Sequence, residues 1–247
     1  MSADMSFRDL LSLEGKTAVV TGGAGGIGSV TVEHLLRAGA RVICLDLPGK
    51  SAPDAAIFKA CDFSDPDQIT NTMEEIRDEV GGFDILVHCA GITRDRVLWK
   101  MTDEDWDAVF EVNLDSAFFL LRAATPFFRE RGDGRVVLIS SINGERGKLG
   151  QANYAASKAG LIALGRTAAR ELGRFGVRVN CIAPGLILTS MVEALPDEVI
   201  AKANEEIVLG RVGKPSDVAN AVLFLCSEMS AHITGQVLRV DGGQLMA

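Results

Sequence analysis

The chain has 247 residues, 47% apolar and 23% charged, and its 33 acidic against 25 basic residues give a net charge of −8. These proportions are typical of a soluble globular protein. An acidic chain with no basic run argues against nucleic acid as a partner, because non-specific affinity for phosphates comes mainly from Lys and Arg. One count stands out, since 11 Phe and 2 Trp accompany a single tyrosine, Tyr154.

The most apolar stretch and the N-terminal residues both argue against a membrane or secretory protein. Residues 114–128 form the richest apolar window, but Asp115 and Arg122 interrupt it, and a membrane-spanning helix needs about 20 mostly apolar residues. Residues 1–13 lack the basic start and apolar centre of a signal peptide. We therefore expect a cytoplasmic protein without a membrane partner.

The cysteine and histidine residues give no sign of a disulfide framework or a metal site. The 5 cysteines contain no C-x-x-C pair, and most lie in apolar runs, where a free thiol behaves as a small apolar side chain. His34 and His232 have no clustered acidic or cysteine neighbours. No metal is expected.

Short apolar runs alternate along the chain with longer segments of helical periodicity. The runs are too short for helices and too continuous for strands with one solvated face, so they predict strands covered on both sides. The predicted strands are residues 17–21, 41–45, 57–61, 85–88, 135–140, 178–183 and 236–240. Helix starts are indicated at Asp65, Thr102 and Pro215.

This alternation predicts one α/β domain over residues 1–247, a Rossmann-type doubly wound parallel sheet flanked by helices. No internal repeat or long linker interrupts the pattern. Residues 1–14 form an N-terminal extension. Residues 186–209 contain a possible helix with no clear strand after it, and we predict that they form a mobile substrate loop.

A glycine-rich loop follows the first predicted strand, since residues 21–28 read TGGAGGIG and a helical pattern comes next. Glycines let the chain turn sharply and bring a diphosphate close to backbone N–H groups, and the positive end of the next helix favours the anion. A tight strand-to-helix connection alone would explain the glycines. Their place between the first strand and the first helix favours a dinucleotide site.

Asp46 ends the second predicted strand, 18 positions after Gly28. Its carboxylate would accept hydrogen bonds from the adenosine ribose and repel a 2′-phosphate, which selects NAD over NADP. Gly25 stands where a basic residue could reverse this preference. The alternative is a strand-end aspartate that only caps its own turn.

Four polar residues predict proton chemistry. Tyr154 and Lys158 are spaced i, i+4 in a helical stretch, so they share one face, and a nearby ammonium would lower the phenol pKa below its usual 10. Ser141 follows a strand, where a hydroxyl can hold a carbonyl oxygen. Asn113 lies in an apolar helical region and needs partners if it is buried. A Tyr/Lys pair alone would also fit a surface helix, but the glycine loop makes that interpretation much weaker.

These residues resemble the short-chain dehydrogenase/reductase family over about residues 16–243. The matching motifs are Thr21-Gly22 with Gly26-Ile27-Gly28, Asp62 after the third strand, Ala90-Gly91 after the fourth, Asn113 in Val-Asn-Leu, Ser141, Tyr154-x-x-x-Lys158 and Pro184-Gly185-x-Ile187-x-Thr189.

The resemblance implies a role for each catalytic residue. Tyr154 is the general acid/base, Lys158 also binds the nicotinamide ribose, and Ser141 orients the substrate oxygen. Asn113 supports a water-linked proton relay. The other predicted cofactor contacts are Gly22, Gly25, Gly26, Ile27, Gly28, Asp46, Leu47, Cys89, Ala90, Gly91, Pro184 and Gly185, with Asp62 and Phe63 by the adenine and Ile187 and Thr189 by the nicotinamide carboxamide.

The chain departs from the family where the fourth strand ends. The family usually has Asn-Asn-Ala-Gly there, whereas this chain has His88-Cys89-Ala90-Gly91. We expect His88 to be a satisfied structural histidine rather than a catalytic one, and Cys89 to contribute mainly its backbone. The exchange affects local cofactor packing more than the chemistry.

Within the family, the motifs at residues 91–95, 150–160 and 233–236 resemble 3-oxoacyl-thioester reductases. Reductases that serve acyl carrier protein usually prefer NADPH and dock the acidic carrier on basic residues. Here Asp46 indicates NAD, and the relevant segments offer only Arg129, Arg131, Arg135 and Arg174. The sequence therefore leaves open whether the substrate is instead a hydroxyacyl-CoA or a simpler alcohol or ketone.

We thus predict an NAD(H)-dependent oxidoreductase that interconverts a secondary alcohol and a ketone, with a 3-hydroxyacyl/3-oxoacyl thioester of CoA or acyl carrier protein as substrate. The alternatives are a dehydrogenase of a non-thioester alcohol and, disfavoured by the complete catalytic set, a non-catalytic nucleotide-binding subunit. The pocket is expected from residues 94–98, 143–149 and 186–209, where Arg146 and Lys148 would meet an anionic substrate or be solvated. The family and the apolar helices at 102–128 and 154–175 imply a homo-tetramer or dimer, alone or with a related subunit.

Overall fold

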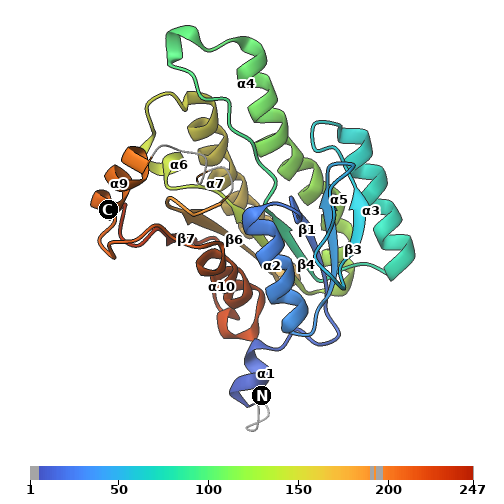
Figure 1. Ribbon diagram of the computed structural model, residues 1–247. Coiled ribbons are helices and arrows are strands. Elements are labelled where there is room, and N and C mark those ends of the chain that lie inside the picture. Colours follow the sequence, from blue (N-terminus) through green and yellow to red (C-terminus); the bar gives the residue numbers. More distant parts are fainter. Residues whose placement is uncertain (1–5, 190–191, 193–196, 247) are drawn as a thin grey trace.

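The apolar runs of the sequence pair into one parallel sheet in the computed structural model, which describes residues 6–189, 192 and 197–246 (Figure 1). Each strand ends within one residue of its predicted bounds. The strand order is β3-β2-β1-β4-β5-β6-β7, which confirms the Rossmann-type fold. The strands are β1 (Thr17–Thr21), β2 (Arg41–Asp46), β3 (Ile57–Ala60), β4 (Ile85–His88), β5 (Gly134–Ile139), β6 (Val177–Pro184) and β7 (Val237–Val240).

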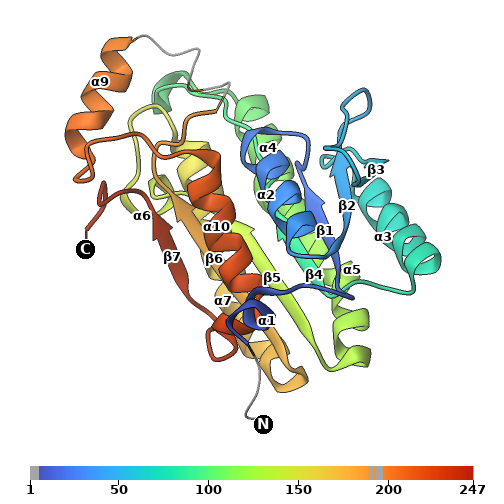
Figure 2. The same cartoon turned by 60° about the horizontal axis from the view of Figure 1, so that its bottom comes forward.

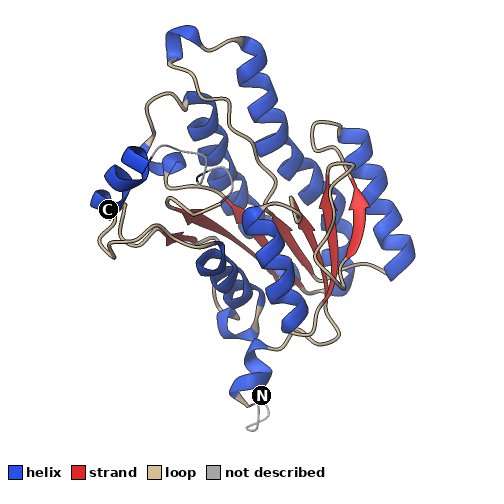
Figure 3. Ribbon diagram, in the orientation of Figure 1, coloured by secondary structure: helices blue, strands red, loops and turns tan. Residues whose placement is uncertain are grey.

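Helices cover both faces of the sheet, as Figures 2 and 3 show. On one face, α2 (Gly26–Arg37) packs beside α10 (Pro215–Cys226), and the other face carries α3 (Pro66–Val80), α5 (Ser116–Arg131) and α7 (Ala152–Leu172). The remaining helices are α1 (Phe7–Leu11), α4 (Asp103–Phe110), α6 (Asn143–Arg146) and α9 (Asp197–Glu206), with 3₁₀ turns at Leu98–Lys100, Gly173–Phe175 and Glu228–Ser230.

Successive residues of the central strands enter two different cores. Val19 packs into the core under α3, α5 and α7, while its neighbour Val20 packs into the core under α2 and α10, and both are fully buried. Side chains alternate between the two faces of a strand, so a strand covered on both sides must be apolar at every position. This explains the continuous apolar runs of the sequence.

Two of the three predicted helix starts are confirmed by side-chain caps, and α10 begins at Pro215 as predicted. The Asp65 carboxylate accepts hydrogen bonds from the N–H groups of Asp67 and Gln68, at 3.0 and 3.1 Å. The Thr102 hydroxyl accepts one from the N–H of Asp105 at 3.1 Å. These side chains satisfy N–H groups that have no partner within the helix.

The predicted apolar helix over residues 102–128 is not a single α-helix. A π-helical turn, Glu111–Asp115, separates α4 from α5 and contains Asn113. Such turns disturb the regular hydrogen-bond ladder and occur often at functional sites. The periodicity of the sequence does not distinguish this turn from α-helix, because it adds only a local widening.

The predicted substrate loop, residues 186–209, is described in part. Residues 190–191 and 193–196 lie outside the described residues. Before them, Ile187 forms a bridge with Gly213, and after them α9 supplies the helix that the sequence indicated. The mobility of the loop stays a prediction.

Candidate active site

The carboxyl ends of β1, β4 and β5 bring the predicted functional segments together. These strands are neighbours in the sheet, and they lead into the glycine loop, into Ala90-Gly91 and into Ser140-Ser141. The strand order reverses between β1 and β4, which is where open α/β sheets bind their ligands. The topology thus assembles residues that lie more than 100 positions apart.

The glycine loop has the shape of a phosphate cradle. Gly22 has φ +62°, and a Cβ there would lie 2.8 Å from the Ala90 nitrogen, so only glycine fits between the two strand ends. α2 begins at Gly26, and its N-cap, Gly25, gives no side-chain hydrogen bond to the free N–H groups. These groups and the helix dipole suit a diphosphate.

Asp46 lies beside this loop and is nearly buried, with 9% of its surface exposed. Its carboxylate accepts hydrogen bonds from the N–H groups of Ala24 and Leu47, at 2.9 and 2.8 Å. The capping role considered from the sequence is therefore real. It leaves acceptor capacity on both oxygens, because a carboxylate offers about four lone-pair sites.

The other predicted cofactor contacts flank the loop. Asp62 accepts hydrogen bonds from the N–H and hydroxyl of Ser64, at 2.9 and 2.7 Å, and the adjacent Phe63 is buried. On the opposite side, Thr189 lies against Gly26, since a Cβ on that glycine would come within 2.8 Å of the threonine methyl. The segment after β6 thus lies against the start of α2. Its contact with the nicotinamide carboxamide stays a prediction.

Lys158 is buried at the centre of the site. Its ammonium donates to the carbonyl of Ile139 at 2.9 Å and lies 5.7 Å from the centroid of the Tyr154 ring. Burial lowers the pKa of Lys158 to about 8. Near neutral pH the ammonium form therefore prevails.

Tyr154 contradicts one prediction from the sequence. Burial raises the pKa of Tyr154 above its ordinary value, Asp95 raises it further, and a hydrogen bond with Ser141 opposes them only in part. The predicted fall of the phenol pKa below 10 is therefore wrong. The i, i+4 spacing indicated the neighbouring lysine, but it did not show that the phenol is buried. The phenol is a protonated acid near neutral pH.

Asn113 is fully buried and holds the loop after β4. Its amide exchanges two hydrogen bonds with the backbone of Ile92, at 2.8 and 3.0 Å, and donates a third to the hydroxyl of Ser157 at 3.1 Å. A Cβ on Gly91 would lie 3.1 Å from the Lys158 nitrogen and 3.3 Å from the Asn113 oxygen. Asn113 and Lys158 therefore meet at Gly91.

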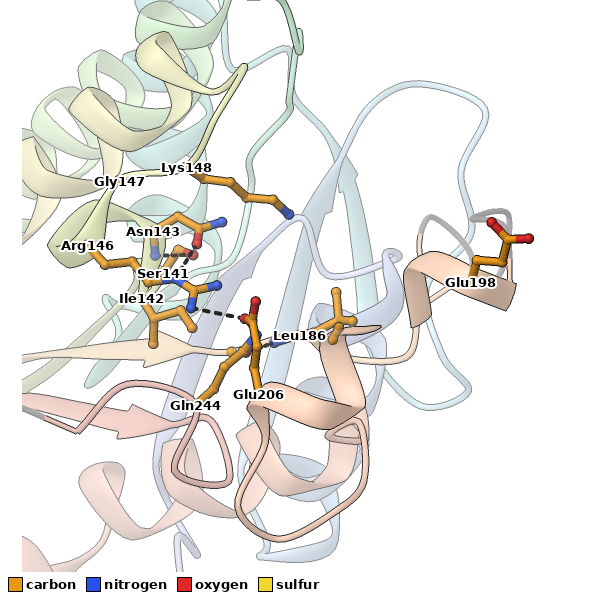
Figure 4. A pocket seen from close by; sticks show the side chains of 12 residues that line it. Ser141, Ile142, Asn143, Arg146, Gly147, Lys148, Leu186, Glu198, Glu206 and Gln244 are labelled. Carbon is orange, nitrogen blue, oxygen red and sulfur yellow. Dashed lines mark hydrogen bonds and ion pairs between the residues drawn. The ribbon is translucent and has the colours of Figure 1, made fainter. Parts of the chain in front are cut away.

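A cavity of about 630 Å³ opens beside Ser141 (Figure 4). Segments 143–149 and 186–209 contribute to it as predicted. Residues 94–98 are not among its lining residues, although Asp95 lies close enough to Tyr154 to affect the pKa of the phenol. Their part in the substrate pocket stays a prediction. They are held against the start of α7, where Arg96 pairs with Gln151. The cavity is lined by Ser141, Ile142, Asn143, Arg146, Gly147, Lys148, Gly185, Leu186, Glu198, Ala203, Glu206 and Gln244.

The C-terminal tail supplies a lining residue that the sequence did not indicate. Gln244 accepts a hydrogen bond from the N–H of Leu186 and donates one to Glu206, both at 3.1 Å. Arg146 donates to the same carboxylate at 3.3 Å, so α6, α9 and the tail meet at Glu206 (Figure 4). No local motif marks Gln244, since only the fold brings it here.

Comparison with known proteins agrees with this geometry. The family model described as enoyl-(acyl carrier protein) reductase matches residues 22–244. The 3-oxoacyl-[acyl-carrier-protein] reductase FabG of Thermotoga maritima is 42% identical over 94% of this chain and 99% of its own length. FabG of Escherichia coli is 41% identical over 96% and 100%, and the acetoacetyl-CoA reductase of Synechocystis is 42% identical over 94% and 97%.

The chain belongs to the short-chain dehydrogenase/reductase family. It is a nicotinamide-dependent oxidoreductase that acts on CH–OH groups and the corresponding ketones. In the part of this dehydrogenase/reductase that the structure describes, no helix is long and apolar enough to cross a bilayer.

The departure of this dehydrogenase/reductase from the usual family motif is resolved in the structure. His88 is fully buried and bonded to Thr21, as expected of a structural histidine. The Cys89 N–H donates to the Thr21 carbonyl at 3.1 Å, and burial raises the pKa of its thiol to about 12. The Cys89 thiol is therefore protonated and unreactive near neutral pH. The contact of Cys89 with the cofactor stays a prediction.

Proposed function

We propose that the chain is an NAD(H)-dependent reductase of 3-oxoacyl thioesters, which also catalyses the reverse oxidation of 3-hydroxyacyl thioesters. One observation supports this proposal most strongly. The chain combines a complete set of Ser141, Tyr154 and Lys158 with Asp46, which lies beside a glycine loop that has no basic side chain. The first group fits ketone reduction, and the second fits NAD. The names of the relatives, which specify acyl carrier protein and CoA thioesters, support the substrate class.

The proposed reduction uses the protonated phenol directly. When bound, the nicotinamide supplies a hydride to the carbonyl carbon, and oxidation returns it. The Ser141 hydroxyl holds the carbonyl oxygen while Tyr154 gives that oxygen its proton, which breaks the O–H bond of the phenol and forms that of the alcohol. The Lys158 ammonium, 5.7 Å from the ring centroid, stabilises the phenolate that remains. Asn113 keeps Gly91 and Ile92 in place beside them.

Two forms of the thioester are compatible with the surface. Arg129 and Arg174 both stack on Phe175, each 4.7 Å from the ring centroid, and together with Arg170 they line a surface hollow of about 450 Å³. On a chain of net charge −8, this basic cluster suits an acidic carrier protein. Because the arginines are few, a CoA thioester is the alternative substrate, and the experiment below compares the two.

The experiment measures NADH and NADPH oxidation with acetoacetyl-CoA, its acyl-carrier-protein analogue and simple ketones. We expect thioesters to exceed simple ketones in kcat/KM, and NADH to exceed NADPH by roughly 10- to 100-fold, because Asp46 repels a 2′-phosphate. Asp46→Asn should lose most of the cofactor preference. The control Asp54→Asn, an exposed acid on the loop after β2, should keep it.

Each part of the proposal has its own contrary result. Preference for NADPH in the unchanged protein would contradict the charge argument, and faster turnover of simple ketones than of both thioesters would contradict the substrate class. The cytoplasmic location and the homo-tetramer or dimer remain part of this proposal. Light scattering of the purified protein tests the oligomer.

A further inference from the structure

His88 is a buried polar residue that the proposed mechanism does not use. It ends β4, and its ring lies between Thr21, the last residue of β1, and Ser116, the residue that directly follows the π-helical turn of Asn113, with none of its surface exposed. Its ring has two nitrogens, and both have partners on other elements of the fold. An apolar residue would fill the same space without partners, so the partners need an explanation.

Thr21, His88 and Ser116 form a hydrogen-bonded cluster. The positions of its hydrogen atoms can be assigned from the acceptors around it. The Thr21 hydroxyl oxygen accepts from the Ala90 N–H at 3.3 Å, so its own hydrogen is available to His88 Nδ1 at 2.9 Å. The Ser116 hydroxyl donates to the Val112 carbonyl at 2.7 Å, so towards His88 Nε2, 3.5 Å away, it can only accept. Nδ1 is therefore the acceptor, and Nε2 carries the hydrogen.

The His88 ring also reaches Asn113 itself. The imidazole forms a hydrogen bond with the Asn113 backbone, which raises its pKa slightly against two larger opposing effects. Burial and the nearby Lys158 ammonium together lower the pKa of His88 to about 3. The ring is neutral throughout the working range, and its hydrogen-bond pattern does not change there with pH.

The cluster spans the two halves of the site. On one side, Thr21 begins the glycine loop and binds Ala90, which faces Gly22. On the other side, the π-helical turn holds Asn113, whose amide meets Lys158 at Gly91. The His88 side chain contacts both sides.

We propose that His88 is a positioning residue that fixes the π-helical turn of Asn113 relative to the glycine loop, so that the Asn113 amide keeps its place beside Lys158. This inference rests on the proposed function, in which Asn113 and Lys158 support proton transfer from Tyr154. His88 touches neither substrate nor the reacting atoms in this role. Its effect on turnover passes through Asn113.

A double-mutant cycle tests this path. His88→Leu should lower kcat about tenfold with little change in the ketone KM, because the buried hydrogen bonds of the ring to Thr21, Ser116 and the Asn113 backbone are lost. In an Asn113→Ala background the same exchange should lower kcat less than twofold, since the residue through which it acts is gone. Equal losses in both backgrounds would overturn the proposal.

A matched control separates positioning from stability. Asn180 is also buried, on β6, where it bonds the Ile233 carbonyl and the Gln236 N–H, at 2.9 and 3.0 Å. Asn180→Leu should lower the melting temperature as His88→Leu does, but keep kcat per folded molecule. A similar fall of kcat in both variants would make His88 a merely structural residue.

Rescue and spectroscopy give two further readouts. His88→Asn retains one acceptor and one donor and should recover a large part of the kcat that His88→Leu loses, whereas equal losses would contradict a hydrogen-bonding role. Nitrogen-15 NMR of the ring should show the hydrogen on Nε2 from pH 5 to 9, and an imidazolium in that range would also overturn the proposal.

One pair of variants separates this inference from the proposed function. If Tyr154→Phe is inactive while His88→Leu turns over normally, this inference fails and the proposed function stands.

Discussion

Two regions of the site differ in burial and in how their polar groups are paired. We call the carboxyl ends of the strands, with Asn113 and Lys158, the edge, and we call the entrance of the cavity, with Arg146 and Glu206, the rim. At the edge, Asn113 and Lys158 are buried and bonded to backbone carbonyls and hydroxyls. At the rim, Arg146 and Glu206 are partly exposed and form an ion pair across the opening. Buried, bonded groups hold one geometry, whereas exposed charges exchange partners with water at little cost. We infer that the edge sets the chemistry and the rim tunes which substrate enters.

The largest effect should follow from removing the proton donor at the edge. Tyr154→Phe keeps the ring and removes the hydroxyl, so reduction should fall by roughly 10²- to 10⁴-fold while nucleotide affinity stays within about twofold. Turnover and cofactor fluorescence titration measure the two quantities. Activity near that of the unchanged protein would remove Tyr154 from the mechanism.

Lys158, at the edge, should also determine the pH above which the enzyme loses activity. Burial lowers the pKa of Lys158 to about 8, so the ammonium is present below that pH and is lost above it. The kcat/KM for reduction should therefore fall as the pH rises through about 8. Lys158→Arg keeps the charge and should move this fall to higher pH, and the exposed control Lys50→Arg should leave the profile unchanged. A flat profile to pH 10 would contradict this role.

The smallest effect should come from the rim. The Arg146 and Glu206 side chains are 28% and 49% exposed, and an ion pair of that kind contributes only about 0.2–1 kcal/mol. Arg146→Met should change KM by about two- to fivefold and leave kcat within about twofold. Arg37→Ala breaks an exposed pair on α2 and is the control. A loss of kcat comparable to that of Tyr154→Phe would mean that the rim takes part in chemistry.

Much of the site could be predicted because its signals are local. The apolar runs mark strands covered on both sides, and the glycine loop follows the first of them directly. The spacing of Tyr154 and Lys158 places both on one helix face. These inferences depend on neighbours within a few residues, which the sequence displays.

Other features depend on contacts between distant segments. The sequence placed Lys158 near Tyr154, yet burial reverses the expected direction of the phenol pKa. Gln244 reaches the cavity only because β7 returns the tail beside Leu186. Residues 94–98 are held against the start of α7, where Asn153 donates a hydrogen bond to the Arg94 carbonyl.

The sequence by itself determined the strands, the glycine loop, the reaction class and the identity of the residues that could carry it, including the lone tyrosine. Only the tertiary structure decided how those residues are solvated, which oxygens and nitrogens they bond, and that His88 joins the two halves of the site. The physical reason is that backbone preference and side-chain periodicity act locally, whereas desolvation and hydrogen-bond pairing arise when distant segments pack together.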